Sequence, residues 1–240
     1  MRTGINCLRA WVVGVLLVAG GDSGASVGSV LGTIRIEGAR PARPKLRVYK
    51  HVEVCGEDIP DERLVLGPNG GLRYVVVTVE AASGETRARP EADLVLDNHD
   101  CRFEPHVQTA AVGQWVELRN SDPILHNADA RRGQDTLFNV ALTPGRRVRK
   151  PLDHAGVIRV TCDVRHTWMK AYIVVVDHPF HAVTDIYGDY EIRGLPPGKY
   201  VLRAWHEELG TQQHPVTIEA DKATQQDITY PTPTAAEPPP

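Results

Sequence analysis

Residues 184–205 read TDIYGDYEIRGLPPGKYVLRAW, and this stretch decides the fold. Gly188 opens a strand-like run, the letters LPPG form a turn, and Tyr200, Leu202 and Ala204 alternate along the next run. A period of two is typical of a strand with one buried face, and two such runs joined by a short Pro- and Gly-containing turn predict a β-hairpin.

Strand-like runs of the same kind recur along most of the chain after residue 30. Short alternating runs between turn signals predict β-sandwiches or barrels, and no long amphipathic helix is predicted. The 240 residues include 21 Gly and 18 Pro, which suits a turn-rich all-β protein of one or two domains. The net charge of −3 gives no indication of a nucleic-acid-binding protein. The runs are 32–38, 72–80, 92–98, 110–120, 156–162, 171–177, 188–194, 199–205, 214–220 and 225–230.

The two ends of the chain differ from the rest. Arg2 and Arg9 precede a short apolar run at 10–20, and small residues follow it, which predicts a secretory signal peptide over 1–25. An uncleaved anchor is the alternative. We expect the remaining chain to be soluble and either periplasmic or extracellular. Residues 231–240 are rich in Pro and predict a disordered tail.

Removal of the signal peptide, with Cys7, leaves three cysteines. An odd number in an exported protein requires an explanation. In one interpretation Cys55 pairs with Cys101 and Cys162 is a metal thiolate; in the other Cys162 pairs with one of them and a free thiol remains. The count alone leaves both interpretations open.

A metal site is indicated by residues 161–169, TCDVRHTWM, where Cys162, His166 and Met169 follow a predicted strand. Ligands on one loop can converge, and a thiolate, an imidazole and a thioether together favour copper. His126, in NSDPILHNAD, also follows a strand and a turn and completes the set. We expect Asn127 to hold the two loops together by hydrogen bonds. Zinc is the alternative metal, although it prefers Cys, His and carboxylate to thioether.

Residues 94–178 resemble the cupredoxin family of blue copper proteins, through FEPHV (103–107), VGQWVELRN (112–120), LHN (125–127) and the Cys162-x₃-His166-x₂-Met169 loop. The resemblance implies one copper held by His126, Cys162, His166 and Met169. Many cupredoxins have two residues between the Cys and the His, whereas this chain has three. The spacing is closer to the binuclear copper loop of cytochrome oxidase, but Ile158 stands where that loop needs its other Cys.

The hairpin at 184–205 resembles the carboxypeptidase regulatory-like β-sandwich family, which is similar to transthyretin. That family places two strands before the T-D turn, and here they would come from 30–82. We therefore expect a split sandwich, made of 30–82 with 180–230, and a cupredoxin-like copper domain at 90–178 inserted into it. A single elaborated sandwich is the alternative.

The whole arrangement resembles bacterial exported proteins of the methylamine-utilisation or cupredoxin-like type that carry a regulatory-like domain. The resemblance rests on VCG (54–56), GGLRYVVVTVE (70–80), DCRFEPHV (100–107), NSDPILHN (120–127) and LPPGKYVLRAWHE (195–207). In this layout Cys55 lies in one domain and Cys101 in the other. A disulfide between them would join the insert to its host, a contribution of about 2–4 kcal/mol.

Other residues have assignments with alternatives. His106 is a candidate additional metal ligand or a structural histidine whose hydrogen bonds are satisfied. Trp168 could shield the metal from water or be a half-buried loop aromatic. Trp205, His206 and Glu207 could form a ligand or partner surface, or simply end a strand.

The resemblance implies an exported electron-transfer protein that docks with a redox partner such as a c-type cytochrome or a dehydrogenase. A periplasmic copper-binding or copper-delivery module is an alternative, as is a structural cell-surface protein with a stabilising metal. We expect no enzyme, since no Ser/His/Asp set, paired carboxylates or phosphate loop is found, although copper oxidoreductase activity stays open.

Overall fold

The computed structural model describes residues 26–38, 45–80 and 92–232, and their regular secondary structure is almost entirely β-strand, with one short helix. The expected all-β class is confirmed. The predicted signal peptide at 1–25 lies outside the described residues, as does the predicted tail beyond residue 232. Within the described ranges no helix has the length and apolar character that a membrane crossing requires.

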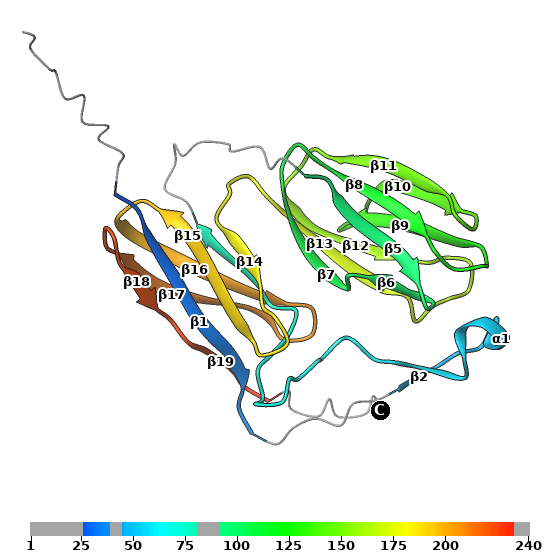
Figure 1. Cartoon of the computed structure of the whole chain (residues 1–240), viewed down its shortest axis with the longest axis horizontal. Coiled ribbons are helices and arrows are strands. Elements are labelled where there is room, and N and C mark those ends of the chain that lie inside the picture. The colour runs from blue at the N-terminus through cyan, green and yellow to red at the C-terminus, as the bar shows by residue number, and fades with distance from the viewer. Residues whose placement is uncertain (1–25, 39–44, 81–91, 233–240) are drawn as a thin grey trace, which may run out of the picture.

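Two sheets at one end of the molecule form what we call the split sandwich (Figure 1). One sheet has the order β15-β1-β18, and β19 also pairs with β1; the other has the order β14-β4-β16-β17. The side chains that alternate inward from these strands form one hydrophobic core. The strands are β1 (Gly28–Ile36), β4 (Val76–Glu80), β14 (His181–Val183), β15 (Asp189–Leu195), β16 (Gly198–His206), β17 (Gly210–Ile218), β18 (Ala223–Gln225) and β19 (Ile228–Tyr230).

The green strands in Figure 1 form a second body, which we call the inserted sandwich. Its sheets have the orders β10-β9-β12-β13-β7 and β11-β8-β5-β6, and they enclose a separate core. The strands are β5 (Leu94–His99), β6 (Arg102–Glu104), β7 (Val107–Ala111), β8 (Gln114–Asn120), β9 (His126–Arg132), β10 (Asp135–Leu142), β11 (Arg147–Leu152), β12 (Gly156–Thr161) and β13 (Lys170–Val176).

The insertion point lies between two neighbouring strands of the split sandwich. The chain leaves after β4 and returns at β14, and these strands pair antiparallel, with His181 opposite Thr78. The strand before the insert and the strand after it are therefore side by side. A domain whose ends lie close together can be accommodated at such a point without opening the host sheet.

Strand β13 contributes to two cores at once. Its sequence KAYIVVV directs Ile173 and Val175 into the core of the inserted sandwich, and Val174 into a third cluster with Tyr74 and Val76. Successive side chains of a strand point to opposite faces, so a run that is apolar at every position fits a strand covered on both faces. This third cluster is the packed junction between the two bodies.

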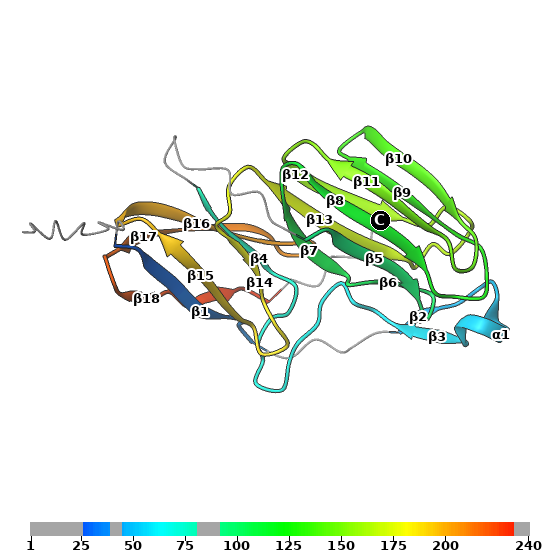
Figure 2. The same ribbon diagram turned by 45° about the horizontal axis from the view of Figure 1, so that its top comes forward.

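Residues 45–60 differ from the predicted domain boundaries. The prediction places them in the split sandwich, but they form a separate segment of β2 (Lys45–Arg47), α1 (Val52–Cys55) and β3 (Asp58–Pro60). This segment, which we call the cap, lies at the end of the inserted sandwich near the β5–β6 turn (Figure 2). Among the residues that the structure describes, strand β2 pairs only with β3, so no described sheet of the split sandwich holds the cap. The Cys55–Cys101 disulfide attaches it to the inserted sandwich, which confirms that pairing.

Two histidines of the split sandwich, the buried His206 and the partly buried His181, are held in the neutral form. Burial lowers the pKa of His206 to about 4, and burial followed by the neighbouring His178 lowers the pKa of His181 to about 4. His206 is 1% exposed, and its Nδ1 accepts the N–H of Glu208. Protonating a buried imidazole costs free energy in the folded state, so the free energy of unfolding falls as the pH is lowered.

We expect Leu118→Ala to lower the free energy of unfolding by about 2–5 kcal/mol, because Leu118 is fully buried in the inserted core. The matched control is Leu137→Ala, since Leu137 is 37% exposed on β10 and its loss leaves no cavity. Urea denaturation measures both. Equal losses for the two variants would contradict the described packing.

We also expect acid to destabilise the metal-free protein partly through His206. An unfolded imidazole binds a proton below about pH 6.5, whereas folded His206 does so only near pH 4. Unfolding therefore takes up protons in this window, and stability falls as pH drops from about 6.5 to 4. His206→Gln should flatten the change in Tm across this window. The control, His154→Gln at an exposed site, should leave it unchanged.

Candidate metal centre

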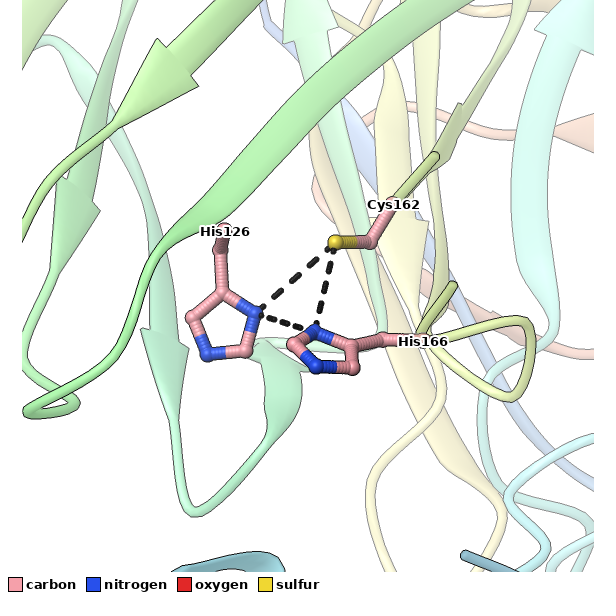
Figure 3. Close-up of side chains that lie close together, drawn as sticks. All are labelled: His126, Cys162 and His166. Atoms are coloured by element: carbon pink, nitrogen blue, oxygen red, sulfur yellow. Dashed lines mark hydrogen bonds between the residues drawn. The ribbon is translucent and has the colours of Figure 1, made fainter. Parts of the chain in front are cut away.

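Three side chains from two neighbouring strand ends point toward one another (Figure 3). His126 begins β9, Cys162 directly follows β12, and His166 lies in the loop between β12 and β13. Strands β9 and β12 are antiparallel, with Thr161 opposite Asp129. This register brings the start of β9 beside the loop that follows β12.

The ligand atoms of these residues form a compact triangle. Cys162 Sγ lies 3.8 Å from His126 Nδ1 and 3.6 Å from His166 Nδ1, and the two Nδ1 atoms are 2.9 Å apart. A point in their plane is about 2 Å from all three atoms, close to the metal–nitrogen and metal–sulfur bond lengths found in proteins. Both histidines are 0% exposed and Cys162 is 3% exposed. The donor set and its size therefore fit one soft or borderline metal ion.

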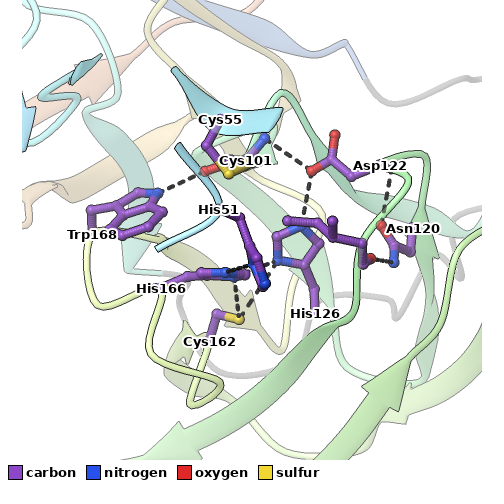
Figure 4. Close-up of a disulfide and its surroundings, with 10 residues drawn as sticks. His51, Cys55, Cys101, Asn120, Asp122, His126, Cys162, His166 and Trp168 are labelled. Atoms are coloured by element: carbon purple, nitrogen blue, oxygen red, sulfur yellow. Dashed lines mark hydrogen bonds and ion pairs between the residues drawn. A yellow bond between two sulfur atoms is a disulfide. The ribbon is translucent and has the colours of Figure 1, made fainter. Parts of the chain in front are cut away.

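The outer nitrogen of each imidazole has its own partner (Figure 4). His126 Nε2 lies 2.9 Å from Asp122 Oδ2, and His166 Nε2 lies 3.0 Å from His51 Nδ1. Such outer contacts fix the tautomer and the ring orientation, which leaves Nδ1 of both rings facing Cys162. Burial, then the neighbouring His126 and His51, lower the pKa of His166 to about 4, so its ring is neutral at pH 7.

The carboxylate of Asp122 is stabilised in its charged form. Burial raises its pKa, but hydrogen bonds from His126 and from the N–H of Cys101 outweigh burial, and the net pKa is lowered. A charged Asp122 accepts the Nε2–H of His126. Cys101, Asp122 and His126 also lie together as a group of metal-ligand types, but the sulfur of Cys101 is occupied by the disulfide.

Asn127 joins the two ligand segments, as predicted. Its backbone N–H donates to Cys162 Sγ at 3.5 Å, and its side-chain oxygen accepts the N–H of Asp163. Asn139 on β10 holds the amide of Asn127 in place, at 2.8 Å. Burial raises the pKa of the Cys162 thiol, and the N–H of Asn127 acts in the opposite direction. The N–H bond therefore favours the thiolate that a metal requires.

Met169 and Trp168 lie in the same loop. The N–H of Met169 donates to the carbonyl of His166 at 2.9 Å, and Met169 is 2% exposed. The indole N–H of Trp168 donates to the carbonyl of Cys101 at 3.0 Å, and its ring centroid lies 5.2 Å from that of His166. Both side chains line a cavity of about 310 Å³ beneath the cap. Trp168 thus packs directly against a candidate ligand.

His106 does not join this group. Its Nδ1 lies 2.9 Å from the carbonyl of Lys170, and its Nε2 contacts Glu207. Both ring nitrogens face protein acceptors, so neither is free for a metal. Of the two alternatives for His106, these contacts fit the structural histidine and not the additional ligand. Trp205 packs on Tyr172 with ring centroids 5.3 Å apart. Trp205 and Glu207 therefore belong to the junction between the two bodies.

Two residues of the site were not assigned a role from the sequence. Asp122 stands in the SDP turn, four residues before His126, and a carboxylate at that spacing was a detectable signal. His51 is 115 residues from His166 and comes from the cap, so no local pattern indicates it. Their positions follow from the tertiary fold.

Comparisons with known proteins give one family match and a set of similar solved structures. Residues 166–231 match the carboxypeptidase regulatory-like domain family, which covers β13 to β19 but not β1 and β4 of the split sandwich. No curated protein sequence matches the chain.

Among solved structures, a copper-containing nitrite reductase (NirK) from Thermus scotoductus SA-01 is similar, with 24% identity over 41% of this chain and a TM-score of 0.34. The chain spans only 25% of that protein. A purple cupredoxin from Nitrosopumilus maritimus has 23% identity, covering 35% of this chain and 100% of its own, with a TM-score of 0.32. Amicyanin from Paracoccus versutus has 19% identity, covering 42% and 97%, with a TM-score of 0.33.

The chain carries a carboxypeptidase regulatory-like domain match at 166–231, and its structural neighbours are cupredoxins.

Proposed function

We propose that this chain is an exported mononuclear copper protein that transfers electrons. The observation that carries the proposal is the triangle of Cys162 Sγ, His126 Nδ1 and His166 Nδ1, with each imidazole held from its other nitrogen. One thiolate and two neutral imidazoles are the donor set of sites that cycle between Cu(I) and Cu(II).

Met169 is the proposed fourth ligand. It lies three residues after His166, its backbone is bonded to that residue, and its side chain is buried. A weak thioether on a set of one Cys and two His distinguishes copper from zinc. A bound copper would supply one-electron redox chemistry, while the protein excludes water and keeps the ligands in place.

The arrangement favours electron transfer over catalysis on a bound substrate. Four protein ligands leave no open position on the metal, and both histidines are fully buried. A redox partner such as a c-type cytochrome or a dehydrogenase would bind transiently, as electron-transfer encounters do. The Cys55–Cys101 disulfide supports an oxidising compartment such as the periplasm.

The test is metal content with visible absorption of the purified chain. We expect one copper per chain and an intense thiolate-to-copper band, and we expect Cys162→Ser to abolish the band. Met169→Leu should keep copper but change the reduction potential. His126→Ala removes a proposed ligand and should also abolish the band. His99→Ala removes an exposed histidine and is the control, which should keep the band. Copper bound only as Cu(I), with no accessible Cu(II) state, would favour copper delivery instead, and zinc alone would refute the proposal.

Asp122→Leu should weaken metal affinity about 10–100-fold, because the carboxylate that orients His126 is lost. Competition with a chromophoric chelator measures the affinity. Asp135→Leu, at an exposed carboxylate, is the control. Unchanged affinity in Asp122→Leu would show that His126 does not depend on this hydrogen bond.

A further inference from the structure

The cap closes the candidate metal centre on the side of His166. This ring is 0% exposed, and its outward Nε2 lies 3.0 Å from Nδ1 of His51. With Nδ1 facing Cys162, the proton of a neutral ring is on Nε2, so His166 donates to His51. His51 is itself partly exposed. The His51 ring is therefore the next group between the buried ligand and the solvent.

His51 is held firmly in this position. Its backbone has the left-handed φ of 55°, a conformation that costs energy for a residue with a side chain and needs support from its surroundings. The support comes from N–H groups of α1 that donate to its carbonyl, from Lys50 bound to the carbonyl of Val164 at 3.3 Å, and from the Cys55–Cys101 disulfide. A rigid contact between His51 and His166 requires little rearrangement when charge passes through it.

The cap also exposes three apolar side chains that are close to His51 in the sequence. Tyr49 is 79% exposed, Val52 is 40% exposed and Val54 is 38% exposed, within three residues of His51 on either side. Single exposed apolar residues are ordinary, and it is the presence of three in one short segment from which we infer an interaction surface. The ionic side chains of the cap cancel, with three basic residues (Lys45, Arg47, Lys50) and three acidic ones (Glu53, Glu57, Asp58). The surface therefore suits a partner with a neutral, apolar face.

We propose that electrons reach and leave the metal centre through His51, and that the cap is the face on which a redox protein docks. The partner presents a neutral apolar surface around its own cofactor. This inference rests on the proposed function. Electronic coupling is stronger through a hydrogen bond than across a gap, and the His166–His51 contact provides such a bond to the rim of the molecule.

A second copy of the same protein is the probe that the test uses. In a mixture of reduced and oxidised copper protein, one electron passes from a reduced copy to an oxidised copy, so no other reactant is consumed. NMR line broadening gives the self-exchange rate. Two neutral faces do not repel each other, so we expect the rate to depend little on salt concentration.

Variants of His51 separate a role in carrying electrons from a role in holding the His166 ring. His51→Gly removes the ring and accepts a positive φ; we expect the self-exchange rate to fall at least about tenfold. His51→Asn also tolerates a positive φ, and its amide oxygen can replace Nδ1 as the acceptor. We expect His51→Asn to restore the wild-type visible spectrum and potential but not the rate. If His51 only held the His166 ring, His51→Asn would restore the visible spectrum, the potential and the self-exchange rate.

Docking is tested with a matched pair of valines. Val52→Asp places a charge on the cap and should slow self-exchange about tenfold, a loss of about 1.4 kcal/mol in docking. Val27→Asp is the control, because Val27 is 44% exposed but lies next to β1 of the split sandwich. Thermal melts confirm that each variant is folded.

The possible outcomes are distinct. A rate that is unchanged or faster in His51→Gly would overturn the inference, since the cap would then insulate the metal. Equal effects of Val52→Asp and Val27→Asp would also overturn it. Metal content and the visible band are recorded on the same samples. A wild type without the band would refute the proposed function and this inference together, whereas a normal band with no dependence on the cap would refute this inference alone.

Discussion

The candidate metal centre depends on the antiparallel pairing of β9 with β12. That pairing sets Thr161 opposite Asp129, so the first residue of β9 and the residue after β12 lie close together at one end of these two strands. A shift of one residue would reverse the face of every side chain on the strand. The register is fixed by the apolar residues that these strands place in the inserted core, such as Ala130 and Val160. The register that packs the core is thus the same register that brings the candidate ligands together.

The three candidate ligands are held in place by neighbouring groups of the protein. Each imidazole is fixed by a group outside the ligand loop, Asp122 for His126 and His51 for His166. The sulfur is fixed by the N–H of Asn127. Preorganisation of this kind would lower the rearrangement that accompanies a change of charge on a metal bound by these side chains. The two outer partners come from different segments, one from the turn before β9 and one from the cap.

Much of this arrangement could be predicted from the sequence, and the reason is its local character. Cys162 and His166 are in one loop, and His126 follows a recognisable strand and turn. The all-β class followed from the period of two along the strands. Strands that are consecutive in the sequence also belong to the same body. β5 to β13 fall within residues 94–176 and form the inserted sandwich, and the remaining long strands on either side form the split sandwich.

The rest could not be predicted because it depends on contacts between distant segments. The cap was assigned to the wrong body, since 45–60 precede β4 in the chain and carry no signal of where they pack. His106 was left open between an additional ligand and a structural histidine, because only the tertiary fold brings Glu207 to its ring. His51 was overlooked for the same reason. Spacing indicates ligands on one loop, but it does not indicate what covers them.

The split of one sandwich around another has a consequence for the order of folding. β1 pairs with β15, β18 and β19, so Ile34 meets Ile228 only after nearly the whole chain is available. Contacts of such high contact order form slowly, because closing a long loop costs entropy before any contact compensates for it. The inserted sandwich has all its strand partners within 94–176. Once it is folded, bringing β4 and β14 together costs less entropy than closing a flexible loop of the about one hundred residues that separate them.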